Sequence, residues 1–235
     1  MMFNVRHYER LGSTNDEARR LAAEGAEHGT VVHADEQTAG RGRLARTWFS
    51  PAGNLYLSLV LRLETPPARR QELSFLASLA VADTVDAMLP KHVRAMLKWP
   101  NDVLIAGAKI AGILIEQADD ATIAGIGLNI LHTPASAGYK TTSIVASGGL
   151  ASVDGARDIL LDRFGKRLAV WQANGFGPVR DAWMERAHPI GASLRVMVSG
   201  ETVEGAFGGL DTDGALLLDV PGGRQRVVAG DVGVV

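Results

Sequence analysis

Alternating apolar and polar positions predict β-strands along much of the chain. The clearest case is NLYLSLVLR (54–62), where every second residue from Leu55 to Leu61 is leucine and falls on one face of a strand. Segment 3–11 has the mixed polarity of an edge strand, and apolar runs predict further strands at 30–36 and 121–130.

The segment VRAMLKWPNDVLIAGAKIAGILIEQ (93–117) has room for three strands. Proline cannot continue a β-ladder, so Trp99-Pro100 ends the first strand and Asn101-Asp102 begins the second. Ala106-Gly107-Ala108 predicts a hairpin turn into the third strand, Lys109–Glu116. Polar residues therefore fall at the ends of strands whose middles are apolar.

Helical spacing of apolar residues predicts four helices, at 13–25, 69–89, 153–174 and 176–187. In the first, Thr14 and Glu17 have the spacing of a capping box, and Gly25 is suited to end the helix. The run Ser13-Thr14-Asn15 therefore predicts a helix cap. A helix start also offers free N–H groups to a ligand, so a binding role stays open beside the cap.

The composition changes after HPIG (188–191), a segment that we interpret as a linker. The rest of the chain consists of short strand-like runs and glycine-rich turns without helical spacing. This pattern predicts a small all-β barrel that packs on the preceding part, because so short a chain buries little surface alone. We therefore expect one domain at 1–187 and a second at 188–235.

Composition limits the classes of function. The chain has 235 residues and no cysteine, which excludes disulfides, thiolate metal sites and a cysteine nucleophile. Its formal charge of −2 provides no basic field for nucleic acid. The apolar stretch 75–89 carries Asp83 and Asp86 and so predicts a buried helix rather than a membrane span. Because the N-terminus has no apolar signal core, we expect a soluble, cytoplasmic protein without membrane partners.

The loop QTAGRGRLARTW (37–48) is the strongest candidate for chemistry. It lies between two predicted strands and combines two glycines with Arg41, Arg43 and Arg46. Glycine lets the backbone approach a ligand, and arginine is a permanently charged donor suited to carboxylates and phosphates. A solvated basic turn remains the alternative. The flanking strands favour a binding loop, because such loops are usually positioned by a rigid scaffold.

Two lysines, Lys98 and Lys109, lie at the ends of apolar strands and need an anion or solvent there. Asn129, inside the apolar run GIGLNI, predicts either a satisfied structural amide or a site residue. No Walker pattern, strand–GxGxxG–helix unit or GxSxG elbow occurs. The histidines fit no metal-ligand spacing. The residues alone thus predict the binding of an anionic, nucleotide-like ligand.

Several long motifs occur in a fixed order: STN, AxxQxAGRGRxxRxWxSPxGNLYLSxxLR, KWPNDxLxxxxKIAGILIE and GIGLNI. In these motifs the chain resembles the biotin–protein ligases over about residues 3–187, and its end resembles that family's C-terminal domain. The resemblance implies an α+β fold. A mixed β-sheet with helices packed on one face, as in class II synthetases and biotin ligases, would precede a small Src-homology-3-like barrel.

The resemblance also implies a two-step reaction. Biotin and ATP, with Mg²⁺ bridging the phosphates, would form biotinoyl-5'-AMP, and a lysine of the biotin carboxyl carrier protein would then take the biotin. The family's biotin-binding positions match Ser13, Thr14, Asn15, Gln37, Gly40, Arg41, Gly42, Arg43, Lys109 and Gly112. Positions around the nucleotide match Arg43, Arg46, Trp48, Lys98, Asn101, Asp102, Lys109 and Asn129.

Three of these residues are candidates for catalysis. Lys109 and Arg43 would reduce the repulsion between the two anionic substrates, and Asp102 would orient or deprotonate the incoming lysine. An unperturbed lysine has a pKa of about 10.4, so this amine needs help to lose its proton. Trp48 is equally consistent with packing and with a ligand contact.

Many members of the family carry an N-terminal helix-turn-helix domain and act as repressors. Here the first catalytic strand begins close to Met1, so we expect a ligase without repressor activity or a nucleic-acid partner. Family members often form dimers, so a homodimer is possible. The alternatives are a lipoate-type ligase or acyltransferase of the same fold, a biotin-sensing binding module and a nucleic-acid regulator. The GRGRxxRxW loop and KWPND argue against the first of these alternatives.

Overall fold

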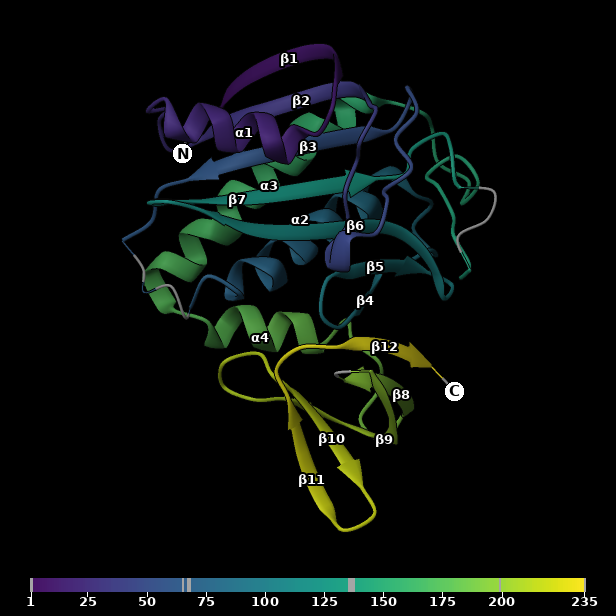
Figure 1. Ribbon diagram of the computed structural model, residues 1–235. Helices are drawn as coiled ribbons and strands as arrows, with labels where there is room; N and C mark the ends of the chain where they lie inside the picture. The colour runs from purple at the N-terminus through teal and green to yellow at the C-terminus, as the bar shows by residue number, and fades with distance from the viewer. Residues whose placement is uncertain (1, 65, 67–68, 135–137, 199, 235) are drawn as a thin grey trace.

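The computed structural model describes residues 2–64, 66, 69–134, 138–198 and 200–234, and it contains two β-sheets (Figure 1). The strands of the larger sheet are β1 (Asn4–Leu11), β2 (Thr30–Gln37), β3 (Leu55–Leu61), β4 (Met96–Lys98), β5 (Asp102–Ile105), β6 (Ala108–Ala118) and β7 (Ala121–Leu128). Their spatial order is β1-β2-β3-β7-β6-β5-β4. Strands β1 and β2 pair in parallel and the other ladders are antiparallel, which confirms the expected mixed sheet.

The predicted strand boundaries agree closely with this sheet. In β3, the leucines from Leu55 to Leu61 are fully buried in the main hydrophobic core. The hairpin between β5 and β6 turns at Ala106 and Gly107, both of which have positive φ, 48° and 77°. A turn of this kind explains the glycine at its second position, because glycine adopts positive φ without steric cost.

The described residues form four α-helices: α1 (Thr14–Ala23), α2 (Glu72–Met88), α3 (Val153–Asn174) and α4 (Gly177–Met184), of which α4 packs on α2, α3 and strand Glu201–Leu210 rather than on the larger sheet. Helix α2 begins three residues later than the apolar spacing predicts, because 69–71 form turns before it. Helices α2 and α3 cover one face, as expected. Helix α1 covers the other face, where its apolar residues Ala18 and Leu21 pack with Val60 of β3 (Figure 1).

The smaller sheet follows α4 and has five antiparallel strands: β8 (Ser193–Val198), β9 (Glu201–Leu210), β10 (Leu216–Val220), β11 (Gly223–Val227) and β12 (Asp231–Val234). Their order is β11-β10-β9-β8-β12, and the pairings among the described residues do not join β11 to β12. The all-β character is as expected. The division of the chain between residues 187 and 188 remains a prediction.

A continuous core joins the two sheets. Its buried residues include Leu57 of the larger sheet and Val196, Phe207 and Leu216 of the smaller one. The indole N–H of buried Trp99 donates a 3.0 Å hydrogen bond to the Gly214 carbonyl, across the seam between the sheets. The larger sheet therefore fixes the position of the smaller sheet beside the ends of β4 and β5.

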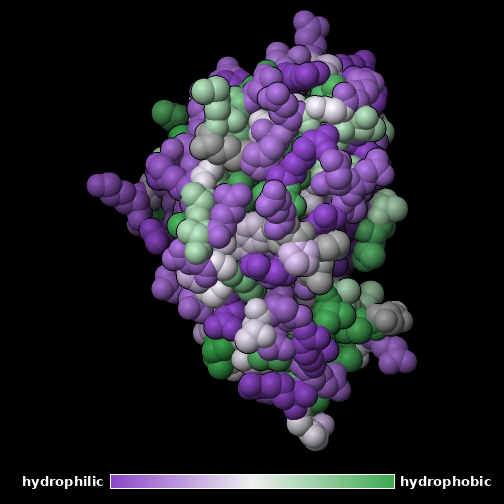
Figure 2. All heavy atoms as spheres, turned by 90° about the vertical axis from the view of Figure 1, so that its left-hand side faces the viewer, coloured by the Kyte–Doolittle hydropathy of each residue, from purple (hydrophilic) through white to green (hydrophobic). Residues whose placement is uncertain are grey.

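The surface on the left-hand side of Figure 1 carries mainly hydrophilic side chains, with small separate groups of apolar residues (Figure 2). No helix in the described part of the chain is long and apolar enough to cross a membrane.

The larger sheet contains one buried histidine of note. His33 on β2 is 1% exposed, and neither of its ring nitrogens has a hydrogen-bond partner among the described residues. The ring of His7 on β1 lies 5.1 Å away, and Asp35, Arg157 and Asp154 provide the nearby charges. Burial is the main cause that lowers the pKa of His33 from 6.5, and the positive charge of Arg157 lowers it further.

This histidine predicts a loss of stability in mild acid. In the unfolded chain His33 gains a proton near pH 6.5, whereas in the folded protein it stays neutral to lower pH. Below pH 6.5 the unfolded state therefore binds more protons, and the free energy of unfolding falls with pH. We expect a shallower fall for His33→Leu between about pH 7 and pH 5, measured by urea denaturation at each pH. Equal slopes for the two proteins would contradict this role.

Candidate active site

A single cavity of about 300 Å³ gathers most of the predicted site residues. It lies between the start of α1, the 37–48 loop, strands β5, β6 and β7, and the edge of the smaller sheet. Of the residues expected from the sequence, it is lined by Ser13, Thr14, Asn15, Gln37, Arg41, Gly42, Arg43, Arg46, Trp48, Lys98, Asn101, Asp102, Lys109 and Gly112. Sequence positions as far apart as Ser13 and Lys109 thus meet in one place.

Neutral polar side chains form one end of the cavity. The side-chain amide oxygen of Gln37 accepts from the Thr14 backbone N–H at 2.8 Å and from the Thr14 hydroxyl at 3.1 Å. Buried Ser58 bonds both the Thr14 hydroxyl and the Asn15 amide oxygen. These bonds hold hydroxyl and amide groups in fixed positions, which is the arrangement that a neutral, hydrogen-bonding ligand requires.

The predicted helix cap is wrong in its detail. Ser13 is the N-cap residue of α1, but its side chain makes no capping hydrogen bond. Thr14 is already helical, and its hydroxyl bonds Gln37 and Ser58. The polar residues of the run Ser13-Thr14-Asn15 therefore face the cavity rather than close the helix.

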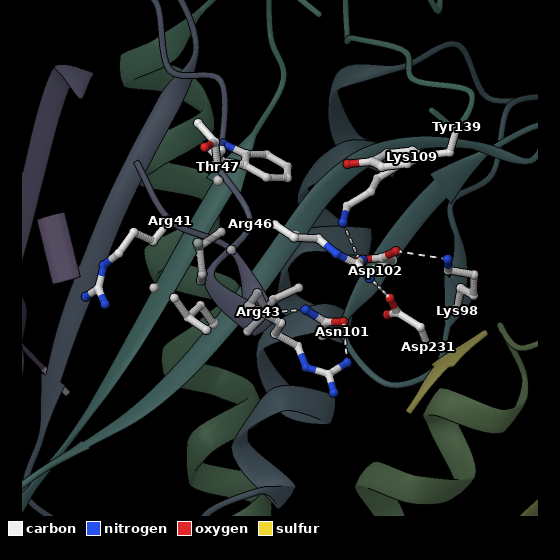
Figure 3. Close-up of a pocket in the computed structure, with 18 of the residues that line it drawn as sticks. Arg41, Arg43, Arg46, Thr47, Lys98, Asn101, Asp102, Lys109, Tyr139 and Asp231 are labelled. Atoms are coloured by element: carbon white, nitrogen blue, oxygen red, sulfur yellow. Dashed lines mark hydrogen bonds and ion pairs between the residues drawn. The ribbon is translucent and has the colours of Figure 1, made fainter. Parts of the chain in front are cut away.

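Cations surround the opposite end of the cavity (Figure 3). The Lys109 ammonium lies 2.6 Å from one carboxylate oxygen of Asp102, and the Lys98 ammonium lies 3.1 Å from the other. All three side chains are at most about a quarter exposed, with values of 16%, 11% and 23% for Lys109, Asp102 and Lys98. Asp102 thus supplies the anion that the sequence left open for these two lysines.

Two aromatic rings flank Lys109. The centroid of the Trp48 ring lies 5.3 Å from its ammonium nitrogen, and the Tyr139 ring lies 5.5 Å away, within range of cation–π attraction. Burial, together with the negative charge of Asp102, raises the pKa of Tyr139 above its ordinary value. Tyr139 is held here because residues next to it bond the Lys109 backbone, with the Lys109 N–H donating to the Lys140 carbonyl at 2.9 Å.

The Trp48 ring packs against β6 and β7 where both strands have glycine. A Cβ atom at Gly127 would lie only 2.6 Å from Trp48 Cε2, and one at Gly112 would lie 3.1 Å from Trp48 Cζ3. The indole N–H of Trp48 has no hydrogen-bond partner among the described residues. Packing and ligand contact are thus compatible for Trp48, since the ring rests on the sheet and also lines the cavity.

The 37–48 loop crosses the cavity as a narrow strap. The Trp48 N–H donates to the Gly40 carbonyl at 2.9 Å, and the Gly42 N–H donates to the Arg46 carbonyl at 2.7 Å. At its tip Leu44 and Ala45 both have positive φ, 54° and 56°, which is uncommon for residues with side chains. Strained backbone of this kind is typical of functional loops.

The strap also reaches the smaller sheet. The Arg43 guanidinium donates to the Gly230 carbonyl at 3.2 Å, and Arg46 forms an ion pair with Asp231 of β12. Lys98 donates to the Val232 carbonyl at 3.0 Å. The smaller sheet therefore closes one side of the cavity and supplies a carboxylate to it.

Two predicted site residues do not line the cavity. Gly40 lies within the strap opposite Trp48, where a Cβ atom would lie 2.6 Å from the Trp48 carbonyl oxygen, so its role is to permit this close approach. Asn129 is buried, and its amide donates to the Thr142 carbonyl at 3.1 Å. Asn129 is thus a satisfied structural amide in this structure, one of the two readings that the sequence left open.

The cavity includes residues that the sequence did not single out. They are mainly small or apolar residues of β6 and β7, Tyr139, and residues of the smaller sheet: Thr47, Ile113, Leu114, Gly125, Ile126, Gly127, Tyr139, Arg195, Met197, Thr202, Asp231, Val232 and Gly233. No motif marks the contribution of the smaller sheet. For β7, the glycines of GIGLNI could have indicated a cavity wall, because they alternate along the strand on the face that meets Trp48.

Comparison with known proteins agrees with this geometry. The family model described as the biotin/lipoate A/B protein ligase family matches residues 8–131, and the model described as the biotin protein ligase C-terminal domain matches residues 194–234. The fold and the cavity therefore define a ligase of the biotin and lipoate class. Within that class the chain belongs to the biotin protein ligase family.

Individual relatives support the same assignment. The chain is 38% identical to the biotin–[acetyl-CoA-carboxylase] ligase of Paracoccus denitrificans, over 95% of this chain and 97% of the relative. A biotin protein ligase from Aquifex aeolicus in complex with biotin and ATP has the same fold, with a TM-score of 0.84 at 24% identity, covering 98% of this chain and 97% of that one. A ligase from Leishmania major in complex with biotinyl-5-AMP has a TM-score of 0.69 at 25% identity, covering 96% and 99%.

The glycine floor under Trp48 gives a direct test of the cavity. Gly127→Ala places a methyl group against the indole, which has to leave its position. We expect activity in a biotin-ligase assay to fall about ten-fold or more, because a displacement of about 1 Å at a site costs on this scale. The control Gly165→Ala on α3 meets Phe3 at an ordinary 3.5 Å and should keep full activity. Full activity in Gly127→Ala would contradict the inference that the cavity needs the Trp48 ring in this position.

Proposed function

We propose that the chain activates biotin with ATP to biotinoyl-5'-AMP and transfers the biotin to a lysine of the biotin carboxyl carrier protein. One observation carries this proposal: the cavity is polarised along its length. Hydroxyl and amide groups line one end, whereas Lys98, Lys109, Arg43 and Arg46 surround the other. Biotin has a neutral ureido ring at one end and a carboxylate at the other, so it fits this cavity in one orientation.

The polar end favours biotin over lipoate. The ureido group both donates and accepts hydrogen bonds, which Thr14, Asn15 and Gln37 match with hydroxyl and amide groups. The dithiolane ring of lipoate has no N–H or carbonyl group with which to bond these side chains. A site built to hydrogen-bond its substrate discriminates strongly against an analogue that lacks the partner groups.

The cationic end suits the first chemical step. A carboxylate attacks the α-phosphorus of ATP, and no base is needed because the carboxylate is already ionised near pH 7. The main barrier that the protein has to lower is repulsion between two anions, which fixed positive charges reduce. Lys109 and Arg43 are the residues to which we assign this role, with Arg46, Trp48, Lys98 and Asn101 around the nucleotide.

Magnesium would arrive with the ATP phosphates. No group of three or more histidine, aspartate or glutamate side chains in the described residues is arranged to hold a metal ion. The dense positive charge of the cavity is consistent with a metal carried by phosphate oxygens rather than by a dedicated protein site.

Asp102 is our candidate for the second step. Its carboxylate accepts from Lys98 and Lys109 and lies at the cavity wall that the smaller sheet completes. The incoming lysine would replace one of these two lysines on the same carboxylate, which would orient it toward the activated biotin and take the proton that its ammonium group has to lose before it attacks. The name of the Paracoccus relative, a biotin–[acetyl-CoA-carboxylase] ligase, supports a carboxylase carrier protein as the acceptor. The absence of repressor activity and a possible homodimer remain predictions.

The whole reaction is tested by mass spectrometry. Purified protein is incubated with biotin, magnesium ATP and an apo carrier domain, and we expect the carrier to gain one biotin. Replacing biotin by lipoate, or the acceptor lysine of the carrier by arginine, should abolish the gain in mass. Modification of the carrier by lipoate alone would favour the lipoate-type ligase instead. Biotin binding in a calorimeter without consumption of ATP would favour a biotin-sensing module.

Lys109→Ala separates binding from chemistry. The ammonium lies at the cationic end, so its loss should slow adenylate formation by about 100-fold, while biotin affinity changes by less than about ten-fold. Pyrophosphate exchange at saturating substrate measures the first effect, and calorimetry measures the second. Lys166→Ala on the exposed face of α3 is the matched control. Equal losses of rate and affinity would mean that Lys109 only binds.

A further inference from the structure

Glu116 belongs to the KIAGILIE motif, yet none of the roles above includes it. Its side chain is 20% exposed and lies beyond the neutral end of the cavity, on the same face of β6 as Gly112 and Leu114. One carboxylate oxygen of Glu116 accepts from Asn15 at 2.7 Å, and it lies 3.2 Å from Arg19 and 3.3 Å from Arg41. Glu116 thus joins β6, α1 and the strap at one point.

Arg41 points away from the cationic end of the cavity (Figure 3). Its guanidinium lies 2.5 Å from Asp16 at the start of α1, in addition to its contact with Glu116. The side chain is 35% exposed. Arg41 therefore belongs to a separate cluster at the neutral end, far from Lys109 and Asp102.

The charges in this cluster balance. Arg19 and Arg41 provide two positive charges, and Asp16 and Glu116 provide two negative ones, all within 3.4 Å of a partner. Arg41 thus has no unmatched charge to offer a ligand carboxylate, whereas the opposite end of the cavity has an excess of cations. The contact of Arg41 with Glu116 therefore serves another purpose than the contacts of Arg43 and Arg46.

The position of Arg41 on the strap indicates that purpose. Its backbone forms an antiparallel bridge with Thr47, and Gly42 beside it lines the cavity. The strap has contacts at both ends: Arg41 bonds α1 and β6, and Arg43 and Arg46 bond the smaller sheet. Arg43 and Arg46 are assigned to the nucleotide, so their bonds to the smaller sheet have to break when ATP binds. The bonds of Arg41 to α1 and β6 can remain, because Arg41 is not assigned to the nucleotide.

We propose that Glu116 and Asp16 anchor Arg41, and that Arg41 is a positioning residue that fixes the strap over the biotin end of the cavity without touching the reacting atoms. This inference rests on the proposed function. Loss of the anchor leaves the strap free to leave the biotin end, which weakens biotin binding while the chemical step, once biotin is bound, proceeds as before.

Arg41→Gln and Arg19→Gln form a matched pair. Both arginines contact Asp16 and Glu116, but Arg41 lies on the strap and Arg19 lies on α1. We expect Arg41→Gln to raise the KM for biotin about five-fold, the scale of a partly exposed ion pair of about 1 kcal/mol, with kcat within about two-fold of wild type. Arg19→Gln should change neither constant by more than about two-fold.

Asp16→Asn distinguishes anchoring from direct ligand binding, because Asp16 contacts Arg41 and Arg19, whereas Glu116 also bonds Asn15 at the biotin end. If Arg41 anchors the strap, Asp16→Asn raises the KM for biotin, and the double variant Arg41→Gln/Asp16→Asn is less impaired than the product of the single effects. If Arg41 instead binds biotin directly, Asp16→Asn frees its charge and leaves KM unchanged or lower. The second outcome overturns the proposal.

Proteolysis gives a readout that does not depend on activity. We expect trypsin to cut after Arg43 and Arg46 several-fold faster in Arg41→Gln than in Arg19→Gln, at equal melting temperature, because the strap has lost one contact. Equal cleavage in the two variants overturns the anchor. Pyrophosphate exchange by the wild-type protein with biotin is measured first, and its absence would contradict the proposed function rather than the anchor.

Discussion

A cavity that collects positive charge to receive anions has to remain stable before the anions arrive. In this structure, carboxylates on different elements solve the problem. Asp102 accepts from two lysines, and Asp231 pairs with Arg46 from across the seam between the sheets. Like charges crowded without such partners would repel one another and destabilise the fold around them. Each of these contacts is also a bond that a phosphate or carboxylate ligand has to replace.

The carboxylates therefore set the selectivity of the cavity as well as its stability. A ligand gains affinity only to the extent that it satisfies the cations better than Asp102 and Asp231 already do. A neutral molecule offers no such replacement. Glycines at 112 and 127 leave space on the sheet for the Trp48 ring, which lines the cavity, and the hydroxyls and amides near α1 define the far end. Shape and charge thus select the same kind of elongated, half-anionic ligand.

Much of this arrangement was predictable from the sequence, because its determinants are local. The leucine alternation of β3, the turn at Ala106-Gly107 and the apolar stripe of α3 each predicted an element that the structure confirms. The long motifs identified 14 of the 27 residues that line the cavity. The capping box predicted from Thr14 and Glu17 was wrong for a physical reason: the hydroxyl of Thr14 bonds Gln37 and Ser58, which lie far away in the sequence. The contribution of the smaller sheet could not be predicted, since it depends on how two sheets pack and leaves no pattern in either.

The participation of β12 has a consequence for the newly made chain. Lys98 and Arg46 find partners at Val232 and Asp231, and the wall of the cavity includes Gly233. Ribosomes release the N-terminal part of a protein first, and it begins to fold before the rest has emerged. The seven-stranded sheet can therefore form early, but the cavity stays open on one side until this last strand is made and has docked. An emerging chain would thus be folded in large part while still unable to retain its ligands.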